Sequence, residues 1–206
     1  MKLVAVSIGS ARPTPGRKTS KTGIFKEPVD HPVLVGAEGL ACDRIVNRKH
    51  HGGPEQAVYL ECLADLQWWE GELGRPVPPG TFGENLVIDG AGLENGRIAI
   101  GDRFQIGDVL LEVTSARVPC ANFALRMEDP LFVKRYTRAA RPGAYARVLE
   151  GGTIRAGDAV TWLPYEGHRV TLPDCLHAVR RPPEGEERAR LLSTPLNRKL
   201  RDWLSG

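Results

Sequence analysis

The chain has 206 residues, of which 41% are hydrophobic and 26% are charged, a composition typical of one globular domain with room for a small appendage. The net charge of +3 is too small to indicate a nucleic-acid polymer as partner, but it is compatible with a local basic pocket for a small anion. No apolar stretch approaches the roughly 18 residues of a membrane span, and the N-terminus lacks the apolar core of a signal peptide, so we expect no membrane partner.

The first half of the chain predicts short strands around one helix. A β-branched run, Lys2–Ile8, predicts a strand, as does Lys21–Pro28. Pro32–Gly36 and Leu40–Ile45 are expected to be short strands or extended segments. Apolar residues then recur at helical spacing over Leu63–Leu73 and predict a helix that ends at Gly74. The aromatic residues of this helix are expected in the core rather than against a cofactor.

From Val77 onward, short apolar runs alternate with glycine-rich turns, a pattern typical of a compact barrel. The predicted strands are Asn85–Ile88, Arg97–Ile100, Arg103–Ile106, Val109–Val118 and Gly143–Glu150. Phe123–Ala140 is expected to be helical with a break at Pro130. Gly151–Gly152 is expected to form a hairpin turn, and Thr153–Pro164 a pair of strands.

The composition changes after Gly167, where three short helices are predicted over Leu172–Val179, Glu184–Leu192 and Pro195–Leu204. We therefore divide the chain into a domain of residues 1–166 and a C-terminal helical appendage of residues 167–206. The predicted fold class is mainly β, a β-barrel with flanking helices and this small appendage.

A cysteine at a predicted strand end is the first candidate for chemistry. Cys120 follows Pro119 and lies three residues after Arg117, with Asn122 beyond it. A lone cysteine is most often a small buried hydrophobe, but a thiol near a cation is also suited to bind a soft metal or to act as a nucleophile. The four cysteines form no CxxC pair and no zinc-finger spacing, which favours reduced thiols in the cytoplasm.

Three further stretches carry polar groups in glycine-rich loops. Lys18–Ile24 offers Lys21 and Thr22 to an anion, or is a solvated loop. In His50–Val58, Gly52 and Gly53 permit close approach to a flat or phosphorylated ligand, or form a structural turn. In Thr81–Leu86, Glu84 and Asn85 are hydrogen-bonding candidates, or part of a turn. The neighbouring histidines His50 and His51 are poorly placed to share one metal.

Motifs for nucleotide cofactors and for the serine nucleophile elbow are missing: the sequence contains no GxGxxG opening a strand–helix unit, no GxxxxGK[ST] and no GxSxG. A Cys–His hydrolase built from Cys120 with His50 or His51 remains open, because sequence alone does not show whether these residues meet.

Taken together, these stretches resemble the MOSC domain, the module homologous to the C-terminal part of molybdenum cofactor sulfurases, and within it the single-chain bacterial YiiM type, which is linked to resistance to N-hydroxylated base analogues. The residues that carry the resemblance are KTGIFKEPV, HHGGPEQAVYL, FGENL, IGDRFQIGDVLLEVTSARVPC and RPGAYARVLEGGTIRAGDAV. The segment Ala41–Arg48 departs from the pattern, being less acidic and less glycine-rich, and it holds Cys42.

The resemblance implies a molybdenum cofactor (molybdopterin) whose metal is bound by Cys120, and no pyridoxal phosphate. It implies a detoxifying oxidoreductase that reduces N-hydroxylated compounds (hydroxylamino-purines, amidoximes and hydroxylamines) to amines, with electrons from an external flavoprotein reductase. The expected cofactor-binding residues are Lys21, Thr22, His51, Gly52, Gly53, Glu84, Asn85, Arg117 and Asn122.

Two other functions stay open at this point. In one, the protein is a cofactor carrier or sulfur-relay module that bears a persulfide on Cys120. In the other, it is a small barrel that binds nucleic acid or a partner while Cys120 is structural, which the weak charge and the lack of interleaved aromatic and basic residues disfavour. The sequence leaves the oligomeric state, and any role of Cys42, open.

Overall fold

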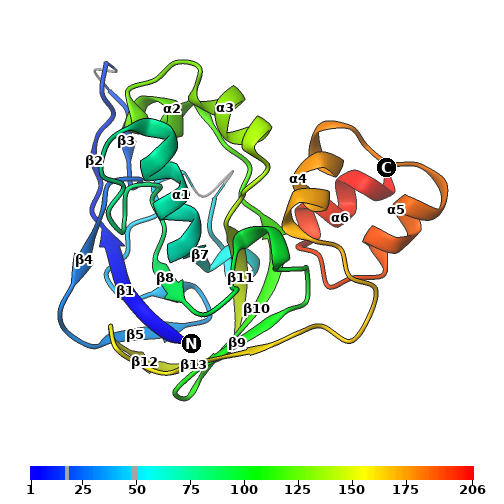
Figure 1. Ribbon diagram of the computed structural model, residues 1–206, viewed down its shortest axis with the longest axis horizontal. Helices are drawn as coiled ribbons and strands as arrows, with labels where there is room; N and C mark the ends of the chain where they lie inside the picture. Colours follow the sequence, from blue (N-terminus) through cyan, green and yellow to red (C-terminus); the bar gives the residue numbers. More distant parts are fainter. Residues whose placement is uncertain (17–18, 48–50) are drawn as a thin grey trace.

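Strands form the body of the structure, a computed structural model that describes residues 1–16, 19–47 and 51–206. The strands are β1 Lys2–Gly9, β2 Arg12–Pro13, β3 Lys21–Thr22, β4 Lys26–Val29, β5 Val33–Gly36, β6 Gly39–Leu40, β7 Val58–Cys62, β8 Leu86–Asp89, β9 Arg103–Ile106, β10 Val109–Ala116, β11 Ala144–Glu150, β12 Gly152–Ile154 and β13 Val160–Leu163. The helices are α1 Leu63–Leu73, α2 Ala121–Met127, α3 Phe132–Ala139, α4 Leu172–Arg180, α5 Gly185–Leu192 and α6 Arg198–Ser205, with short 3-10 helices η1 Pro54–Gln56 and η2 Asn95–Arg97 (Figure 1).

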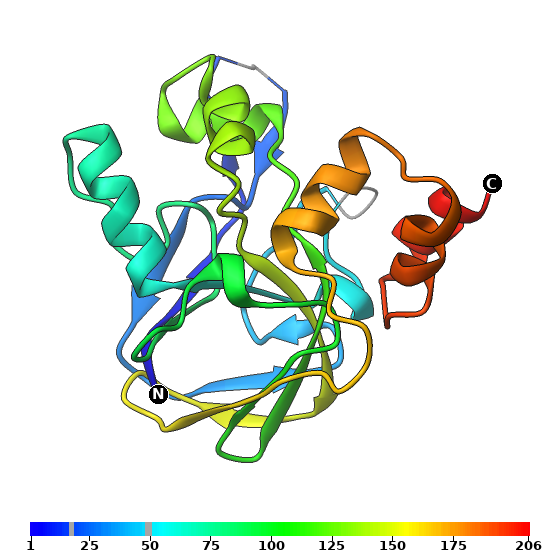
Figure 2. The same cartoon turned by 45° about the vertical axis from the view of Figure 1, so that its right-hand side comes forward.

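The main sheet has eight strands in the order β13-β9-β10-β11-β7-β8-β1-β4. Its neighbours are antiparallel, except that β7 and β8 are parallel. The strands curve beneath the helices (Figure 2). The prediction of a sheet-dominated fold with flanking helices is thus confirmed.

The predicted closure into a barrel is not confirmed. Strands β13 and β4 lie at opposite ends of the strand order. Within the described residues, β1 meets the β13 end of the sheet through one isolated bridge, between Lys2 and Ala159. Backbone hydrogen bonds join Leu3 N to Asp158 O at 2.9 Å and Val160 N to Met1 O at 3.0 Å. These contacts stop after the first residues of β1, so the ladder there is too short to close the sheet.

The three helices α1, α2 and α3 enclose an aromatic core on one side of the sheet. Helix α1 has the predicted bounds and ends at Gly74, whose φ of 62° is left-handed. Trp69 of α1 is buried and stacks on Tyr136 of α3 at 5.8 Å between ring centroids. Phe123 and Phe132 pack edge to face at 4.9 Å. The prediction that the aromatic residues of α1 belong to the core is confirmed.

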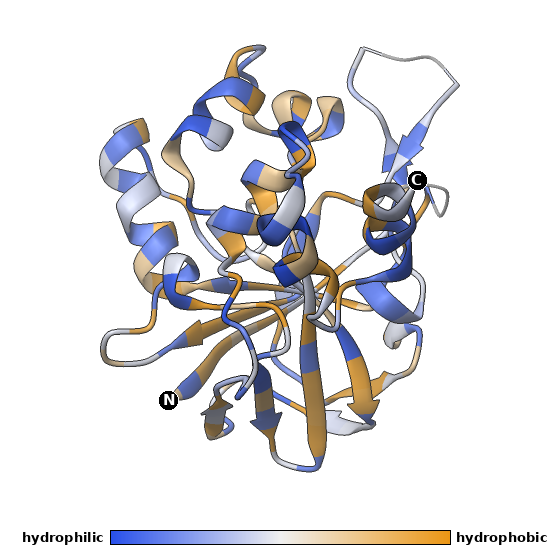
Figure 3. Cartoon of the chain, turned by 90° about the vertical axis from the view of Figure 1, so that its right-hand side faces the viewer, coloured by the Kyte–Doolittle hydropathy of each residue, from blue (hydrophilic) through white to orange (hydrophobic). Residues whose placement is uncertain are grey.

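The three predicted C-terminal helices are present as α4, α5 and α6, and they lie together beside the sheet (Figure 1). Their buried apolar residues, such as Leu176 and Leu204, belong to the same hydrophobic cluster as the strands, whose apolar residues are visible in Figure 3. Asp102 fastens the connection to these helices, because it accepts hydrogen bonds from Tyr165 N at 2.8 Å and from Arg169 Nη1 at 2.9 Å. The boundary at residue 166 stays a prediction.

Two glycines show why local pattern misplaced some strands. The predicted hairpin at Gly151–Gly152 is wrong, because β12 pairs with β5 and β13 pairs with β9. A Cβ at Gly151 would lie 2.7 Å from the carbonyl oxygen of Val35, so glycine serves here for close approach rather than for a turn. Likewise the predicted strand Lys21–Pro28 is divided into β3 and β4. Between them the chain passes so close to Arg44 that a Cβ at Gly23 would lie 1.9 Å from its carbonyl oxygen.

The predicted strand Arg97–Ile100 is also wrong. The segment begins in η2 and continues as buried chain that makes only one isolated bridge within the described residues, between Ala99 and Thr171, while Ala99 N donates to Asp102 Oδ2 at 2.9 Å. None of the helices in the described ranges is long and apolar enough to cross a bilayer.

Candidate functional site

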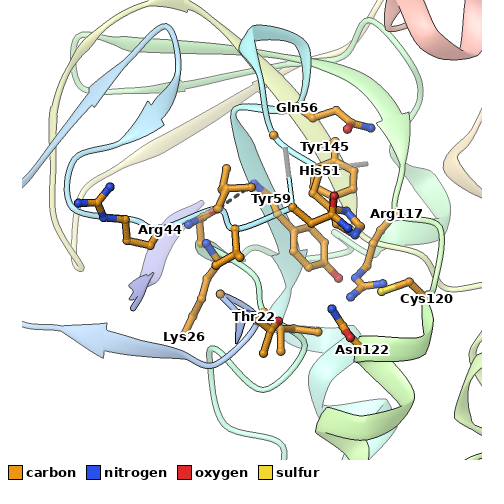
Figure 4. Close-up of a pocket in the computed structure, with 18 of the residues that line it drawn as sticks. Thr22, Lys26, Arg44, His51, Gln56, Tyr59, Arg117, Cys120, Asn122 and Tyr145 are labelled. Atoms are coloured by element: carbon orange, nitrogen blue, oxygen red, sulfur yellow. Dashed lines mark hydrogen bonds between the residues drawn. The ribbon is translucent and has the colours of Figure 1, made fainter. Parts of the chain in front are cut away.

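One cavity gathers most of the predicted site residues. It lies between the loops that follow β3, precede η1, precede β8 and join β10 to α2, and it has an empty volume of about 680 Å³ that opens to solvent (Figure 4). Its described lining is Lys21, Thr22, Gly23, Ile24, Lys26, Arg44, Ile45, Val46, Asn47, His51, Gly52, Gln56, Ala57, Tyr59, Phe82, Gly83, Asn85, Arg117, Cys120, Asn122 and Tyr145.

Cys120 is placed at the cavity by the end of β10 and the start of α2. It is the residue that precedes α2, with extended backbone (φ −128°, ψ 172°), and its side chain makes no capping hydrogen bond. The thiol is half-buried and not in a disulfide. Figure 4 shows the sulfur on the same side of the cavity as Arg117 and Asn122. A metal ion or an electrophile in the cavity can therefore reach this thiol.

Arg117 is a buried cation without an acidic partner among the described residues. It follows β10, donates its backbone N–H to Gly143 O at 2.8 Å, and is 3% exposed. Within the described part of the chain its guanidinium donates two long hydrogen bonds, Nη1 to Val118 O at 3.3 Å and Nη2 to Phe82 O at 3.4 Å, and its Nε has no partner there.

Aromatic rings hold the guanidinium of Arg117 in place. Its Cζ lies 3.9 Å from the centroid of the Phe123 ring and 5.3 Å from that of Tyr59. Rings attract a cation but leave its N–H groups in need of acceptors. Burying an unpaired charge costs free energy unless a counter-charge arrives. We therefore expect Arg117 to bind an anionic ligand.

The charges of the other lining residues point the same way. The described lining contains the cations Lys21, Lys26, Arg44 and Arg117 and no carboxylate. Lys26 is neutralised by a buried ion pair with Asp43 behind the wall, and burial lowers the pKa of its ammonium although Asp43 opposes this. Lys21 and Arg44 are exposed at the rim. The cavity thus has a cationic lining suited to a phosphate or another small anion.

His51 enters the same cavity as a neutral imidazole. Burial, together with the nearby cations Arg117 and Lys199, lowers its pKa to about 4. A neutral ring both donates and accepts one hydrogen bond. His51 and Cys120 line one cavity, but the described contacts contain no hydrogen bond between them. His50, the alternative partner of Cys120, and Lys18 lie outside the described residues.

Eight of the ten predicted site residues line the cavity, and the structure places Gly53 and Glu84 outside the lining. Gly53 has a positive φ of 84° and precedes η1. Glu84 is buried behind the wall, where its carboxyl accepts hydrogen bonds from the backbone N–H of Gly80 and, at 2.9 Å, of Phe82. Burial raises the pKa of Glu84 to about 7.

Asn85 faces the cavity, but its amide also braces the protein. Its Oδ1 accepts from Tyr59 N at 3.1 Å, and its Nδ2 donates to Ser7 O at 3.2 Å and to Asp43 Oδ2 at 3.0 Å. Both amide hydrogens are used in this way. Asn85 can therefore accept one more hydrogen bond from a ligand through Oδ1 but cannot donate one.

The sequence interpretation missed Lys26, Arg44, Gln56, Tyr59 and Tyr145. The two tyrosines are cross-strand partners on β7 and β11, with ring centroids 5.2 Å apart. Their adjacency depends on strand pairing between distant parts of the chain. A signal was present for Tyr59 and Gln56, which lie within the stretch HHGGPEQAVYL that was already singled out.

The sheet with its helical flank and its cationic, thiol-bearing cavity defines the class to which the chain belongs. Residues 47–161 match the model of the MOSC domain, and the chain is a member of this family. The predicted resemblance is therefore confirmed.

Individual relatives agree with this assignment. The chain is 33% identical over 140 residues to the uncharacterized protein YflK of Bacillus subtilis, covering 68% of this chain and 62% of that protein. It is 37% identical over 151 residues to a protein named Reductase from Gibberella moniliformis, covering 70% of this chain and 26% of that protein. The chain thus spans less than two thirds of the length of either relative. The crystal structure of YiiM from Geobacillus stearothermophilus superposes with a TM-score of 0.81 at 25% identity, covering 99% of this chain and 97% of that one.

Proposed function

We propose that the cavity binds the molybdenum cofactor, with Cys120 as a ligand of the metal, and that the protein reduces N-hydroxylated compounds to amines. The observation that carries this proposal is the pairing of two groups in one cavity. A half-buried thiol and a buried arginine, which has no carboxylate partner among residues 1–16, 19–47 and 51–206, line the same cavity. A thiolate suits a soft transition metal, and the guanidinium suits a phosphate.

The residues present fit the cofactor. Molybdopterin carries a phosphate, and Arg117 offers the unpaired Nε–H to such a group. Lys21 and Thr22 lie on the same cavity at β3 and add a second cation and a hydroxyl. Gln56, whose buried Oε1 also lacks a partner, offers an acceptor to a ring N–H. When bound, molybdenum would supply the two-electron redox chemistry of the reaction.

The protein's own residues have three tasks in this proposal. They bind the anionic part of the cofactor at Arg117 and Lys21, orient the substrate with the polar side chains of Asn122 and Tyr59, and limit water through the buried aromatic wall. The overall reaction converts R–NH–OH, two protons and two electrons into R–NH2 and water. The electrons come from an external electron-transfer protein, which we propose is a flavoprotein reductase.

Membership of the MOSC family supports the cofactor, and the relative named Reductase supports an oxidoreductase. Because the chain matches only 26% of that relative, the activity of the whole relative is not transferred by the match alone. The proposal therefore depends on the site.

Expression in two hosts tests this function. Protein from a host that makes the molybdenum cofactor should reduce a hydroxylamine or an amidoxime with a chemical electron donor, and protein from a host that cannot make it should be inactive. Equal activity from both hosts would contradict the proposal. A sulfur adduct on Cys120 without molybdenum, seen by mass spectrometry of fresh protein, would favour a sulfur relay instead.

A further inference from the structure

A buried carboxyl group lies directly behind the cavity and has no part in the site described so far. Glu61 is on β7, two residues after Tyr59 and on the same face of the strand, and it is 1% exposed. Its Oε1 is hydrogen-bonded to the hydroxyl of Tyr59 and lies 3.5 Å from the hydroxyl of Tyr136. Its Oε2 accepts from Asn95 Nδ2.

The surroundings of Glu61 favour the protonated acid. No cation forms an ion pair with it among the described residues. The charged groups that act on it are the carboxyls of Glu84 and of Asp65, and Asp65 is paired with Arg141 at 2.9 Å. Burial raises the pKa of Glu61 to about 8; the hydrogen bonds from Tyr59 and Asn95 oppose this shift, and Glu84 and Asp65 add to it.

The Tyr59 hydroxyl donates to Oε1 of Glu61, and Oε2 accepts from Asn95 Nδ2. A proton on Oε1 of the neutral acid would reverse the hydrogen bond between Glu61 and Tyr59 and leave the Tyr59 hydroxyl to donate into the cavity. Tyr59 in turn lines the cavity, and Figure 4 shows its hydroxyl end directed toward the side that holds Arg117 and Cys120. One hydroxyl group therefore joins a buried acid to the place where a substrate would bind.

The backbone is shaped to accommodate this acid. A Cβ at Gly143 would lie 2.5 Å from Glu61 Oε1 and 2.5 Å from Leu60 O, so only glycine leaves room for the carboxyl group. Gly143 N also donates to the hydroxyl of Tyr136 at 3.1 Å. Because Tyr136 accepts that hydrogen bond, its own proton is free to point to Glu61.

We propose that Glu61 and Tyr59 form a proton relay that protonates the departing oxygen of an N-hydroxylated substrate; this inference rests on the proposed function. The Tyr59 hydroxyl proton passes to the departing oxygen while the Glu61 proton passes to the Tyr59 oxygen, which leaves Tyr59 neutral and Glu61 ionised. The N–O bond breaks with two electrons from the external electron-transfer protein. The oxygen leaves as water, and the second proton comes from solvent and binds the nitrogen to give the amine. After product release, solvent in the open cavity returns the proton to Glu61 through Tyr59.

The test combines two variants with two readouts. Infrared difference spectra of the cofactor-free protein should show the carbonyl band of a buried protonated acid, lost with a midpoint near pH 8. Glu61→Gln should lack the component with the midpoint near pH 8 and keep any component from Glu84, whose pKa is about 7. Tyr59→Phe and the control Glu186→Gln, an exposed residue on α5, should keep the component near pH 8. In the cofactor-loaded protein, Glu61→Gln and Tyr59→Phe should each lower kcat about 100-fold, the lower end of general acid catalysis. The alkaline decline of the parent near pH 8 should also disappear in Glu61→Gln.

The outcomes separate the relay from the function on which it rests. If the parent reduces the substrate and both variants keep its rate and pH profile, the relay is wrong and the proposed function stands. If the component with the midpoint near pH 8 survives in Glu61→Gln, the acid is not Glu61 and the relay is overturned without any activity measurement. A cofactor-loaded parent that reduces no N-hydroxylated compound overturns the proposed function, and the relay with it. Tyr59→Phe keeps the ring packing, so it tests the relay even where Glu61→Gln folds poorly.

Discussion

Replacing Arg117 by methionine should weaken anion binding without weakening the fold. Methionine keeps most of the volume among the rings of Phe123 and Tyr59, and it removes a buried charge that has no acidic partner. An arginine that serves structure alone should show the opposite result, a loss of stability with no change in ligand binding. The two roles therefore predict opposite outcomes.

The magnitudes follow from the contacts of Arg117. The substitution loses two hydrogen bonds of 3.3 and 3.4 Å and a desolvated cation–π contact, the latter worth about 2 kcal/mol. It also removes the desolvation penalty of the buried guanidinium, several kcal/mol. The free energy of unfolding should therefore change by less than about 1.5 kcal/mol in either direction. A charge-assisted hydrogen bond to an anion contributes about 1.5–3 kcal/mol, which corresponds to about 10- to 150-fold in affinity.

Urea unfolding gives the stability, and calorimetric titration with inorganic phosphate as probe gives the affinity. Arg190→Met on α5, an exposed position, controls for the loss of one positive charge. A loss of more than about 3 kcal/mol in unfolding free energy, or unchanged phosphate affinity in Arg117→Met, would refute the reasoning that the unpaired guanidinium is an anion site.

Three further predictions concern buried groups. Because the pKa of Glu61 is raised in the folded state, its neutral form stabilises the fold at low pH, and that contribution is lost as pH rises toward 8. In urea unfolding, the free energy of unfolding of the parent should therefore fall by about 1.4 kcal/mol per pH unit more than that of Glu61→Gln between pH 6 and 8. The same slope against pH in both proteins would contradict this prediction. Gly143→Ala should cost about 1–3 kcal/mol by the same measurement, because its Cβ meets Glu61 and the Leu60 carbonyl; an unchanged midpoint would show that the acid has room to move. Asp102→Asn should weaken the hydrogen bonds to Arg169 by about 1.5–3 kcal/mol and speed proteolytic cleavage between the sheet and α4. An unchanged cleavage rate would mean that apolar packing alone holds the C-terminal helices against the sheet.

Much of the fold was predictable where the determining contacts are local. Helix α1 carries its own apolar spacing and its own terminal Gly74, so its bounds follow from the sequence. The strand pairings were not predictable in this way. Gly151 has the appearance of a turn residue, but its role depends on the distant Val35, whose carbonyl it approaches. The closure of the sheet likewise depends on how far β1 follows β13, which no local pattern encodes.

In the candidate site too, residues placed by local sequence were predictable, and residues placed by distant contacts were not. Cys120 and Arg117 were identified because they share one short stretch at a strand end, and the fold places both on the cavity. Glu84 was expected to contact the ligand, but its carboxyl accepts backbone N–H groups behind the wall, a use that depends on the turn it closes. Glu61 attracted no attention because a glutamate in a strand has no motif. Its buried hydrogen-bonded environment depends on Asn95 and Tyr136, which are 34 and 75 residues away in the chain.

The molybdenum content of Cys120→Ser tests the central claim most directly. Cys120 precedes α2 and makes no capping bond, and serine is a preferred residue at this position, so the variant should fold at least as stably as the parent. Both proteins would be purified from the same cofactor-competent host and analysed for metal by mass spectrometry. The parent should carry molybdenum close to one atom per chain, and Cys120→Ser should have lost most of it. Equal molybdenum in the two proteins would contradict the assignment of Cys120 as the ligand.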